Sequence, residues 1–290
     1  MLRQRIITAV LMLAVLLPAL FHASRWPFAV LTVVLLAAAA WEWGRLNGLG
    51  PVAAWGLGAA CALICLLSWW TGLLQRDLLV VWCLAGLGWV LGGSRLLAGG
   101  VPVWQQVWPG LRCLLGLLCL WAAWLAVVQS RDIGLNFLLS TLTLVWMADV
   151  AAYFAGKAWG GRFIHRKLAP GISPGKSWEG AIGGALGVLA LGAIWSQVEL
   201  FGGGLPVAER SLHGQLLAQH GWFVWLIALV FLSAMSVVGD LVESLLKRSA
   251  GAKDSSGLLP GHGGVLDRVD ALLPVLPLAM MLSGFSRYSA

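Results

Sequence analysis

The chain has 290 residues, of which 60% are hydrophobic and only 11% are charged, against roughly a quarter charged in ordinary soluble domains. With a mean hydropathy of +0.87, this composition excludes a soluble globular domain, a disordered chain and a small disulfide-stapled secreted domain. Its long unbroken apolar runs also exclude an outer-membrane barrel, which has short alternating segments, and predict an all-α polytopic membrane protein. The formal net charge of +7 fits basic loops beside a membrane, so we expect no nucleic-acid partner.

Nine apolar runs are candidate membrane spans, each of which needs about 17–25 residues. We interpret the first run as a retained signal anchor rather than a cleaved signal peptide, because another apolar run follows it at once. The nine candidates cover about 6–22, 27–43, 53–74, 78–93, 113–129, 135–155, 180–198, 221–241 and 270–286.

The distribution of Lys and Arg predicts the orientation of these spans. If the N-terminus lies in the cytoplasm and nine spans alternate, 14 of the 19 Lys and Arg residues fall inside and 5 fall outside. Cytoplasmic loops of membrane proteins are enriched in these residues, so the asymmetry supports both the number and the direction of the spans.

The two parts of the chain differ in the length of their loops. Residues 1–130 contain spans with short connections, and we expect them to serve in anchoring, packing or dimerisation. Residues 131–290 contain two long polar loops, at about 156–179 and 244–269, and the predicted orientation places both in the cytoplasm. We therefore expect the catalytic loops in this second part.

Acidic residues inside spans or at their inner ends are the first sign of chemistry. Asp149, Asp240 and Glu243 lie there, and a carboxylate in a bilayer costs at least about 2.5 kcal/mol, so such residues usually face a polar cavity. Lys247 lies four residues beyond Glu243, which places Asp240, Glu243 and Lys247 on one helix face. Glu42 also lies near an inner span end, and we interpret it as a helix-end or interfacial charge.

The later loop combines three kinds of group that bind phosphates. Basic side chains neutralise phosphates, glycines allow backbone N–H groups to approach an anion, and carboxylates hold Mg²⁺, which usually bridges to substrate phosphates. Together they suit phosphoryl or nucleotidyl transfer, although two of the carboxylates could simply cap a helix. The groups are Lys247, Arg248, Lys253 and Arg268, then His262, Gly263 and Gly264, and finally Asp240, Asp267 and Asp270.

The earlier loop contains a second candidate phosphate site. Its Gly-Lys-Ser tripeptide ends at Ser177, but Pro170 stands where a P-loop needs glycine and no strand precedes it, which excludes a P-loop. We expect Ser173, Lys176 and Ser177 to clamp a phosphate of a lipid or a nucleotide. The alternative is a basic loop that caps the next helix, with Glu179 in its first turn. Glycines at 180, 183, 184 and 187 predict close packing of that helix.

The run from Ser244 to Asp270 resembles the defining motif of the phosphatidate cytidylyltransferases, also called CDP-diacylglycerol synthases. The pattern is Ser-x-x-Lys-Arg, four residues, Lys-Asp, and later Pro-x-His-Gly-Gly-x-x-Asp-Arg-x-Asp, and every fixed position is met. The run from Ser173 to Gly180 is similar to a second stretch of the family, with Ser177 where threonine is more common. The resemblance covers roughly the C-terminal half of the chain.

The resemblance implies that CTP and phosphatidic acid react to give CDP-diacylglycerol and pyrophosphate. It also implies dependence on Mg²⁺, with a second cation as an open alternative, and an inner-membrane location with a cytoplasm-facing site. A homodimer is implied as well. The lipid bilayer then delivers one substrate laterally, while CTP arrives from water, so the site needs access to both.

A mechanistic hypothesis assigns roles to the individual residues. We expect Asp240 and Asp267 to hold the metal ion, with Asp270 either as a further ligand or, like Glu243, as a group that orients these ligands or binds a second cation. The four basic side chains would stabilise the pyrophosphate charge. His262 is either an acid or a hydrogen-bond donor. The remaining candidates are Asp254, which would orient a cation or the ribose, and the substrate-binding residues Asp149, Ser173, Lys176, Ser177, Glu243, Ser244, Gly263 and Gly264.

Three other functions compete with this interpretation. A CTP-dependent polyprenol kinase would transfer the γ-phosphate of CTP and release CDP. A phospho-alcohol transferase would need its own Asp-rich motif, which this sequence lacks. A transporter of anionic solutes predicts charges near the bilayer midplane in both halves, and the first half has no comparable intramembrane charge.

Overall fold

The computed structural model describes residues 2–202, 205–206 and 209–288, and it describes side chains up to residue 284 except at positions 2, 3 and 5. Three basic side chains that enter the predicted orientation, Arg3, Arg5 and Arg287, therefore lie outside the described ones.

The described residues form an all-helical bundle. The helices are joined mostly by short turns, with two longer loops at 160–177 and 250–265. In chain order they are α1 (Leu2–Phe21), α2 (Trp26–Leu46), α3 (Pro51–Trp70), the 3₁₀ turn η1 (Leu73–Gln75), α4 (Leu79–Leu87), the π-helical turn η2 (Gly88–Gly93), α5 (Ser94–Gln106), α6 (Pro109–Ile133), α7 (Leu135–Trp159), α8 (Trp178–Phe201), α9 (Leu212–Ser249), α10 (Leu266–Val269) and α11 (Leu272–Tyr288).

Seven helical stretches among the described residues are long and apolar enough to cross a membrane, with α4, η2 and α5 counted as one stretch. The predicted class, an all-α polytopic membrane protein, is confirmed. The first and last predicted spans coincide with α1 and α11. The apolar part of α1, Ile6–Phe21, and the 17-residue helix α11 are both shorter than the seven stretches above. The count of nine spans therefore stays a prediction. The predicted boundary at residue 130 falls inside α6.

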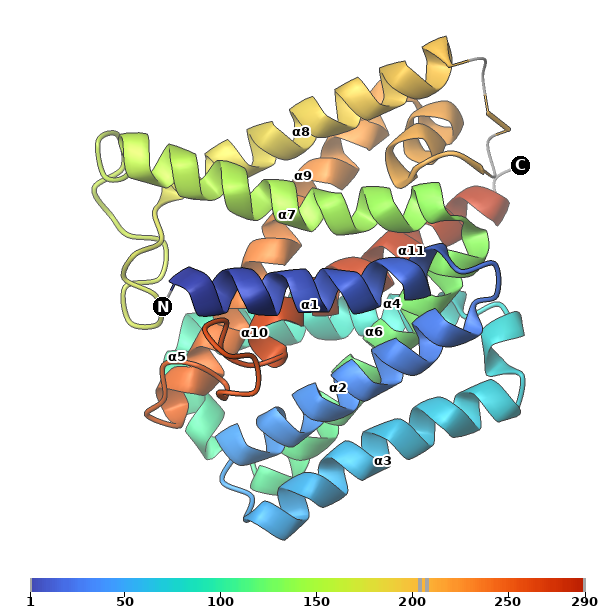
Figure 1. Cartoon of the computed structure of the whole chain (residues 1–290). Coiled ribbons are helices and arrows are strands. Elements are labelled where there is room, and N and C mark those ends of the chain that lie inside the picture. Colours follow the sequence, from blue (N-terminus) through green and yellow to red (C-terminus); the bar gives the residue numbers. More distant parts are fainter. Residues whose placement is uncertain (1, 203–204, 207–208, 289–290) are drawn as a thin grey trace.

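The helices run back and forth between two ends of the bundle. Figure 1 shows the N-terminus, the 160–177 loop and the 250–265 loop at one end, which we call the loop end. The end of α8, the start of α9 and the end of α11 lie at the opposite end (Figure 1). The two long loops, separated by more than 70 residues of sequence, therefore meet on the same side, as the alternation of spans predicted.

Glycines break two of the long helices. Gly100 in α5 has a φ of +65°, and Gly221 in α9 has a φ of +75°, a region of backbone space that is accessible chiefly to glycine. The break at Gly221 separates a short helix at 212–220 from the long span that carries Asp240 and Glu243. The predicted span begins at the same residue, 221.

The predicted close packing of the glycine-rich helix α8 is confirmed, and its partner is α7. A Cβ atom at Gly184 would lie 2.8 Å from the carbonyl oxygen of Ala148, and one at Gly180 would lie 3.1 Å from that of Ala152. The two backbones therefore touch, as in small-residue helix pairs of membrane proteins. This contact brings the start of α8 beside Asp149 on α7.

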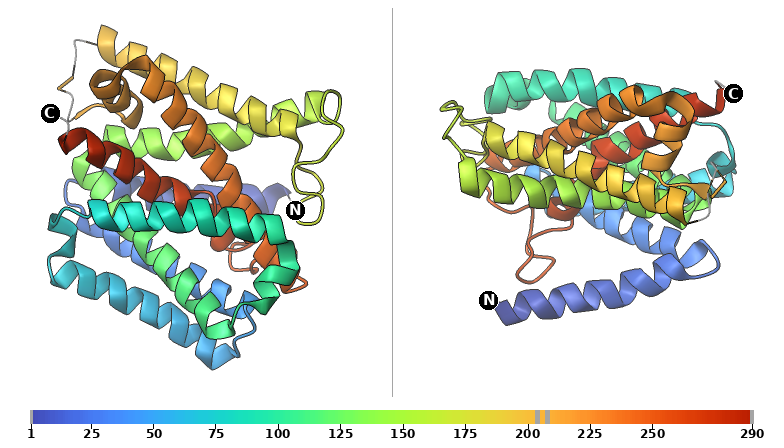
Figure 2. Two further views of the ribbon diagram at one scale, coloured as in Figure 1. Left: turned by 180° about the vertical axis from the view of Figure 1, so that it is seen from behind. Right: turned by 90° about the horizontal axis from the view of Figure 1, so that it is seen from above.

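The helix α1 lies along the outside of the bundle, as the view from above in Figure 2 shows. It nevertheless reaches the loop end, because the Thr8 hydroxyl donates a 2.9 Å hydrogen bond to the carbonyl oxygen of Pro260. The later loop is thus held in place by α1 as well as by the elements that adjoin it in sequence.

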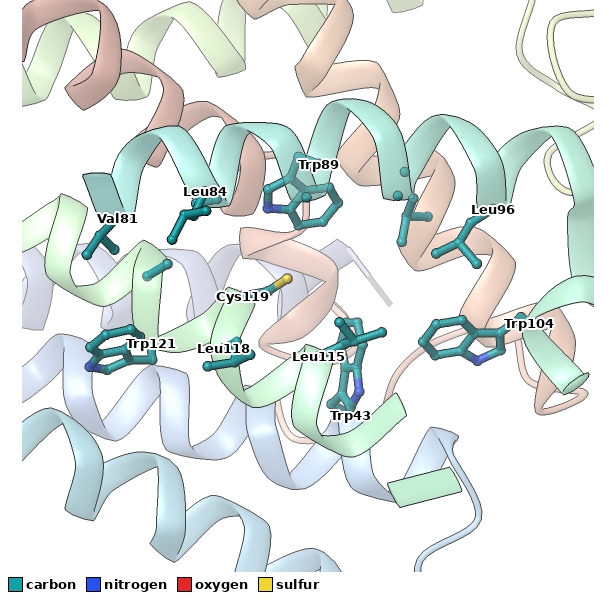
Figure 3. Close-up of a pocket in the computed structure, with 16 residues that line it drawn as sticks. Trp43, Val81, Leu84, Trp89, Leu96, Trp104, Leu115, Leu118, Cys119 and Trp121 are labelled. Carbon is teal, nitrogen blue, oxygen red and sulfur yellow. The ribbon is translucent and has the colours of Figure 1, made fainter. Parts of the chain in front are cut away.

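An apolar cavity of about 400 Å³ lies between the α4–η2–α5 stretch and α6. Figure 3 shows it lined by Trp43, Trp89, Trp104 and Trp121 together with aliphatic side chains. The residues that line it carry no charge, so we place the chemistry elsewhere, at the loop end.

Candidate active site

The earlier loop contacts helix α9 at the loop end. The Lys176 ammonium of the earlier loop lies 2.5 Å from Oδ2 of Asp240 on α9. Nε of Arg248, at the end of α9, donates a 3.3 Å hydrogen bond to the carbonyl oxygen of Ile172. The expectation that sequence-distant stretches build one site is therefore met for the Lys176 and Asp240 side chains.

A polar cavity of about 420 Å³ surrounds this Lys176–Asp240 pair. Asp149 from α7, Ser177 and Tyr153 also line it. The cavity lies where the close α7–α8 contact ends, so it brings two carboxylates and the ammonium groups of Lys157 and Lys176 together near the predicted depth of lipid headgroups. An ammonium group and polar surroundings of this kind can bind a phosphate.

The two serines of the earlier loop differ in their surroundings. Ser177 is the N-cap of α8, and its hydroxyl accepts a 3.1 Å hydrogen bond from the Gly180 amide. The capping interpretation of this residue is thus confirmed, while its phosphate contact stays a prediction. Ser173 closes the preceding turn through its backbone amide, which donates to the Ala169 carbonyl at 2.8 Å.

The backbone at Asp270 lies close to α9 because that helix has a glycine, Gly239, at the point of contact. A Cβ atom at Gly239 would lie 2.5 Å from the carbonyl oxygen of Asp270 and 3.0 Å from Cα of Ala271. The motif aspartate is thereby held against the turn of α9 that carries Asp240.

A second ionic cluster lies one turn further along α9. The Lys247 ammonium is 2.5 Å from Oε2 of Glu243 and 2.6 Å from Oδ1 of Asp267. The predicted common face of Asp240, Glu243 and Lys247 is consistent with these contacts, because Lys247 bonds to Glu243 within the helix. Lys247 therefore joins α9 to α10.

The Asp267 carboxylate accepts hydrogen bonds at both oxygens. Oδ1 faces Lys247, while Oδ2 accepts from the Ser255 amide at 2.9 Å, the Ser255 hydroxyl at 2.7 Å and the Gly264 amide at 2.8 Å. Burial by itself would raise the pKa of Asp267, but the hydrogen bonds from Lys247, Ser255 and Gly264 together hold it well below its usual range. Asp267 is therefore a carboxylate that organises its loop as well as a candidate ligand.

The other motif residues lie at the outer surface of the later loop. Arg268 is exposed and donates two hydrogen bonds, of 3.1 and 2.7 Å, to the His262 carbonyl oxygen. Lys253 and Asp254 are also exposed, so an anionic ligand from water could reach them. Gly263 has a φ of +82°, which allows the sharp turn after His262.

The contacts of the remaining candidate, Ser244, are weak. Its hydroxyl donates to Oδ1 of Asp240 at 3.4 Å, at the long limit for a hydrogen bond. We therefore describe Ser244 as a neighbour of Asp240 rather than as an anchor of the site.

The carboxylates of the site are the groups that would bind a divalent cation. Among the residues that the structure describes, no three His, Cys, Asp or Glu side chains are arranged to hold one metal ion. Lys176 and Lys247 face two of the carboxylates instead. The backbone at Asp270 is nevertheless held against the turn of α9 that carries Asp240, and carboxylate oxygens are the ligands that Mg²⁺ takes. The donor chemistry therefore suits a divalent cation, while its binding stays a prediction.

Sequence reasoning missed one residue of the site, Glu42 on α2. The sequence predicts a helix-end or interfacial charge at Glu42. It does lie near the end of α2, but the interfacial alternative is wrong, because Glu42 is completely buried, with 0% exposure. Its carboxylate accepts hydrogen bonds from the Val265 amide at 3.0 Å and the Leu266 amide at 2.6 Å, and from the hydroxyls of Ser255 and Ser256. The sequence separation of more than 200 residues hides this partnership.

Taken together, the loop end has the parts that phosphate chemistry requires. Two ammonium groups, backbone turns rich in glycine and several carboxylates lie beside a cavity at the predicted headgroup depth. Such a set positions anionic groups and neutralises charge, and phosphoryl and nucleotidyl transfer consist mainly of these two tasks.

Comparison with known proteins agrees with this chemistry. The model of the Cytidylyltransferase family matches residues 3–285, so the likeness extends well beyond the C-terminal half. A phosphatidate cytidylyltransferase of Pseudomonas aeruginosa is 39% identical over 282 residues, covering 96% of this chain and 95% of the relative. One from Haemophilus influenzae is 34% identical over 296 residues, covering 96% of each. The chain therefore belongs to the cytidylyltransferase family.

Proposed function

We propose that this protein is a phosphatidate cytidylyltransferase, which transfers CMP from CTP to phosphatidic acid and releases pyrophosphate. The observation that carries the proposal is the Lys176–Asp240 contact. It joins the earlier loop to α9, the helix that leads into the later loop, in one cavity with charged side chains, on a chain whose relatives bear that name.

In the reaction, a phosphate oxygen of phosphatidic acid attacks the α-phosphorus of CTP. The bond from that phosphorus to the bridging oxygen of the β-phosphate breaks, and pyrophosphate leaves with the electron pair. A phosphate monoester is nucleophilic near neutral pH, so this step needs no strong general base. The chain has to align two anions that repel each other and to stabilise the charge that develops on pyrophosphate.

Each group of residues serves one of these tasks. Lys176 would hold a phosphate in the cavity lined by Asp149 and Asp240. Lys247, together with the exposed Lys253 and Arg248, would neutralise the nucleotide's phosphates. The two loops and the end of α9, which carry these cations, lie at one end of the bundle (Figure 1).

Magnesium belongs to the proposal as an expected cofactor. The motif carboxylates Asp240, Asp267 and Asp270 would hold it, and it would neutralise negative charge on the two phosphates. We further propose that the loop end faces the cytoplasm at the inner membrane, where CTP is available, and that the chain forms a homodimer.

The test is an assay with purified protein, phosphatidic acid, Mg²⁺ and CTP labelled in either the α- or the γ-phosphate. We expect the α-label in the lipid product and the γ-label in pyrophosphate. A γ-label in the lipid would identify a CTP-dependent lipid kinase instead, and solute exchange in liposomes without any product would identify a transporter.

Replacing Lys176 with alanine tests the proposed phosphate clamp. We expect Lys176→Ala to raise the KM of a substrate roughly tenfold, as the loss of one charge-assisted hydrogen bond does, with a smaller fall in kcat. Lys176→Arg should recover part of the affinity because it keeps the charge.

The control for this experiment is Arg45→Ala. Arg45 is another cation of the bundle, but it lies over the Trp41 ring, with 4.7 Å between Cζ and the ring centroid, and outside the cavity. A fall in kcat with both KM values unchanged in Lys176→Ala would contradict the clamp.

A further inference from the structure

Glu42 provides a direct link between the amino-terminal helices and the motif loop. It lies on α2, whereas its partners lie at positions 255, 256, 265 and 266. The helix α10, which carries Asp267, begins at Leu266. The amides of Val265 and Leu266 are at the start of this short helix, where backbone N–H groups have no partner within the helix. Glu42 satisfies two of them.

Three donors point at the Glu42 carboxylate alone, namely two backbone amides and the Ser256 hydroxyl. A fourth donor, the Ser255 hydroxyl, shares its single proton between Glu42 and Asp267. An ionised carboxylate is the side chain that can accept all four, because both of its oxygens are acceptors only. Glutamine has the same shape, but its NH₂ group would face at least one of these donors. The site therefore requires the carboxylate and not merely a side chain of that size.

Ser255 connects Glu42 to the candidate ligand Asp267. Its hydroxyl lies 2.7 Å from Oδ2 of Asp267 and 3.2 Å from Oε2 of Glu42. Asp267 in turn accepts from Lys247. A continuous series of polar contacts thus runs from α2 through the motif loop to α9, and it determines where the Asp267 oxygens lie.

The motif glycine at position 264 supports the same link independently. A Cβ atom at Gly264 would collide with Oε1 of Glu42 and with the Ser255 hydroxyl oxygen. Any other residue at this position would displace the carboxylate or the loop. Gly264 is therefore required by the presence of Glu42, in addition to any contact of its amide with a substrate.

We propose that Glu42 is a positioning residue for the transfer reaction. It fixes the backbone at 265–266 and the Ser255 hydroxyl, and through them the orientation of Asp267. The loop between Ser255 and Gly264 is rich in glycine, so without this anchor it would sample many conformations. The proposal rests on the proposed function for its catalytic consequence, but the ordering of the loop can be measured separately.

The test compares Glu42→Gln with the wild-type protein in detergent. We expect kcat to fall about 10- to 100-fold, as for residues that orient a ligand through hydrogen bonds, while the KM values change less than about threefold. Hydrogen–deuterium exchange of amides in 255–270 should be about tenfold faster, and that in 160–177 unchanged. Glu42→Asp keeps the charge and should retain more activity than Glu42→Gln.

The matched control is Glu199→Gln at the opposite end of the bundle. Glu199 is also a buried carboxylate, and it accepts hydrogen bonds from the Ser211 amide at 2.7 Å and the Asn136 amide group at 2.6 Å. Its replacement should lower thermal stability without changing kcat or the exchange of 255–270. If Glu42 only stabilised the fold, Glu42→Gln would have the same effects as Glu199→Gln.

The outcomes separate the two proposals. If the wild-type protein makes CDP-diacylglycerol but Glu42→Gln matches Glu199→Gln in kcat and exchange, the positioning role is wrong. If the wild-type protein transfers no cytidylyl group, the proposed function is wrong, while the exchange measurement still decides whether Glu42 orders the loop. Should Glu42→Gln not fold, Ser255→Ala replaces it, with an expected tenfold fall in kcat and retained folding.

Discussion

Asp267→Asn should lower the rate of CDP-diacylglycerol formation by about 10³-fold or more. The Asp267 carboxylate faces donors at both oxygens: Lys247 at one, and the Ser255 and Gly264 amides at the other. Asparagine has one carbonyl oxygen and one NH₂ group. Whichever way the amide is turned, its NH₂ group faces a donor, and the negative charge that would attract a metal ion is lost.

The measurement is steady-state turnover of purified protein, together with circular dichroism and thermal unfolding to show that the fold remains. The control is Asp132→Asn, because Asp132 is also an ion-paired carboxylate, 2.6 Å from Arg25, but at the end remote from the loops. Near-normal product formation by Asp267→Asn would remove this residue from the proposed metal ligands.

The second large effect is expected for Asp240→Asn, which should lower kcat by about 10²- to 10³-fold. Asp240 is both the partner of Lys176, at 2.5 Å, and one of the carboxylates near Asp270. Its neutralisation would remove a candidate metal ligand and would release the lysine that we expect to hold a phosphate.

A double-mutant cycle with Lys176→Ala tests this dual role. Because the two side chains are in contact, their effects should not add, and the double variant should be scarcely slower than Asp240→Asn. Strictly multiplicative losses in kcat/KM would show that the two residues act independently. The amount of Mg²⁺ needed for half-maximal rate should rise in Asp240→Asn and not in Lys176→Ala.

Much of the local structure could be predicted from the sequence because it depends on local patterns. Apolar runs of helical length determine membrane helices wherever they occur, and each predicted span coincides with a helix among the described residues. Ser177 caps α8, and the glycines of α8 pack on α7, as their positions indicated. The spacing of Glu243 and Lys247 likewise predicted a shared helix face, and their ion pair is present.

The site was predicted less completely, because its contacts join residues far apart in the chain. The motif identified Asp267 and Lys247, but not that Ser255 would link Asp267 to a carboxylate on α2. Glu42 stands between two tryptophans near the end of an apolar run. No local pattern distinguishes such a residue from an interfacial charge.

The sequence by itself determined that this protein is a helical membrane protein with the loop chemistry of a cytidylyltransferase, since hydropathy and motif are properties of short segments. Only the tertiary structure decided which carboxylates and ammonium groups pair, and that the second helix anchors the loop of the tenth. The physical reason is that a buried carboxylate must find donors, and the helix packing of the whole bundle determines which donors come within reach.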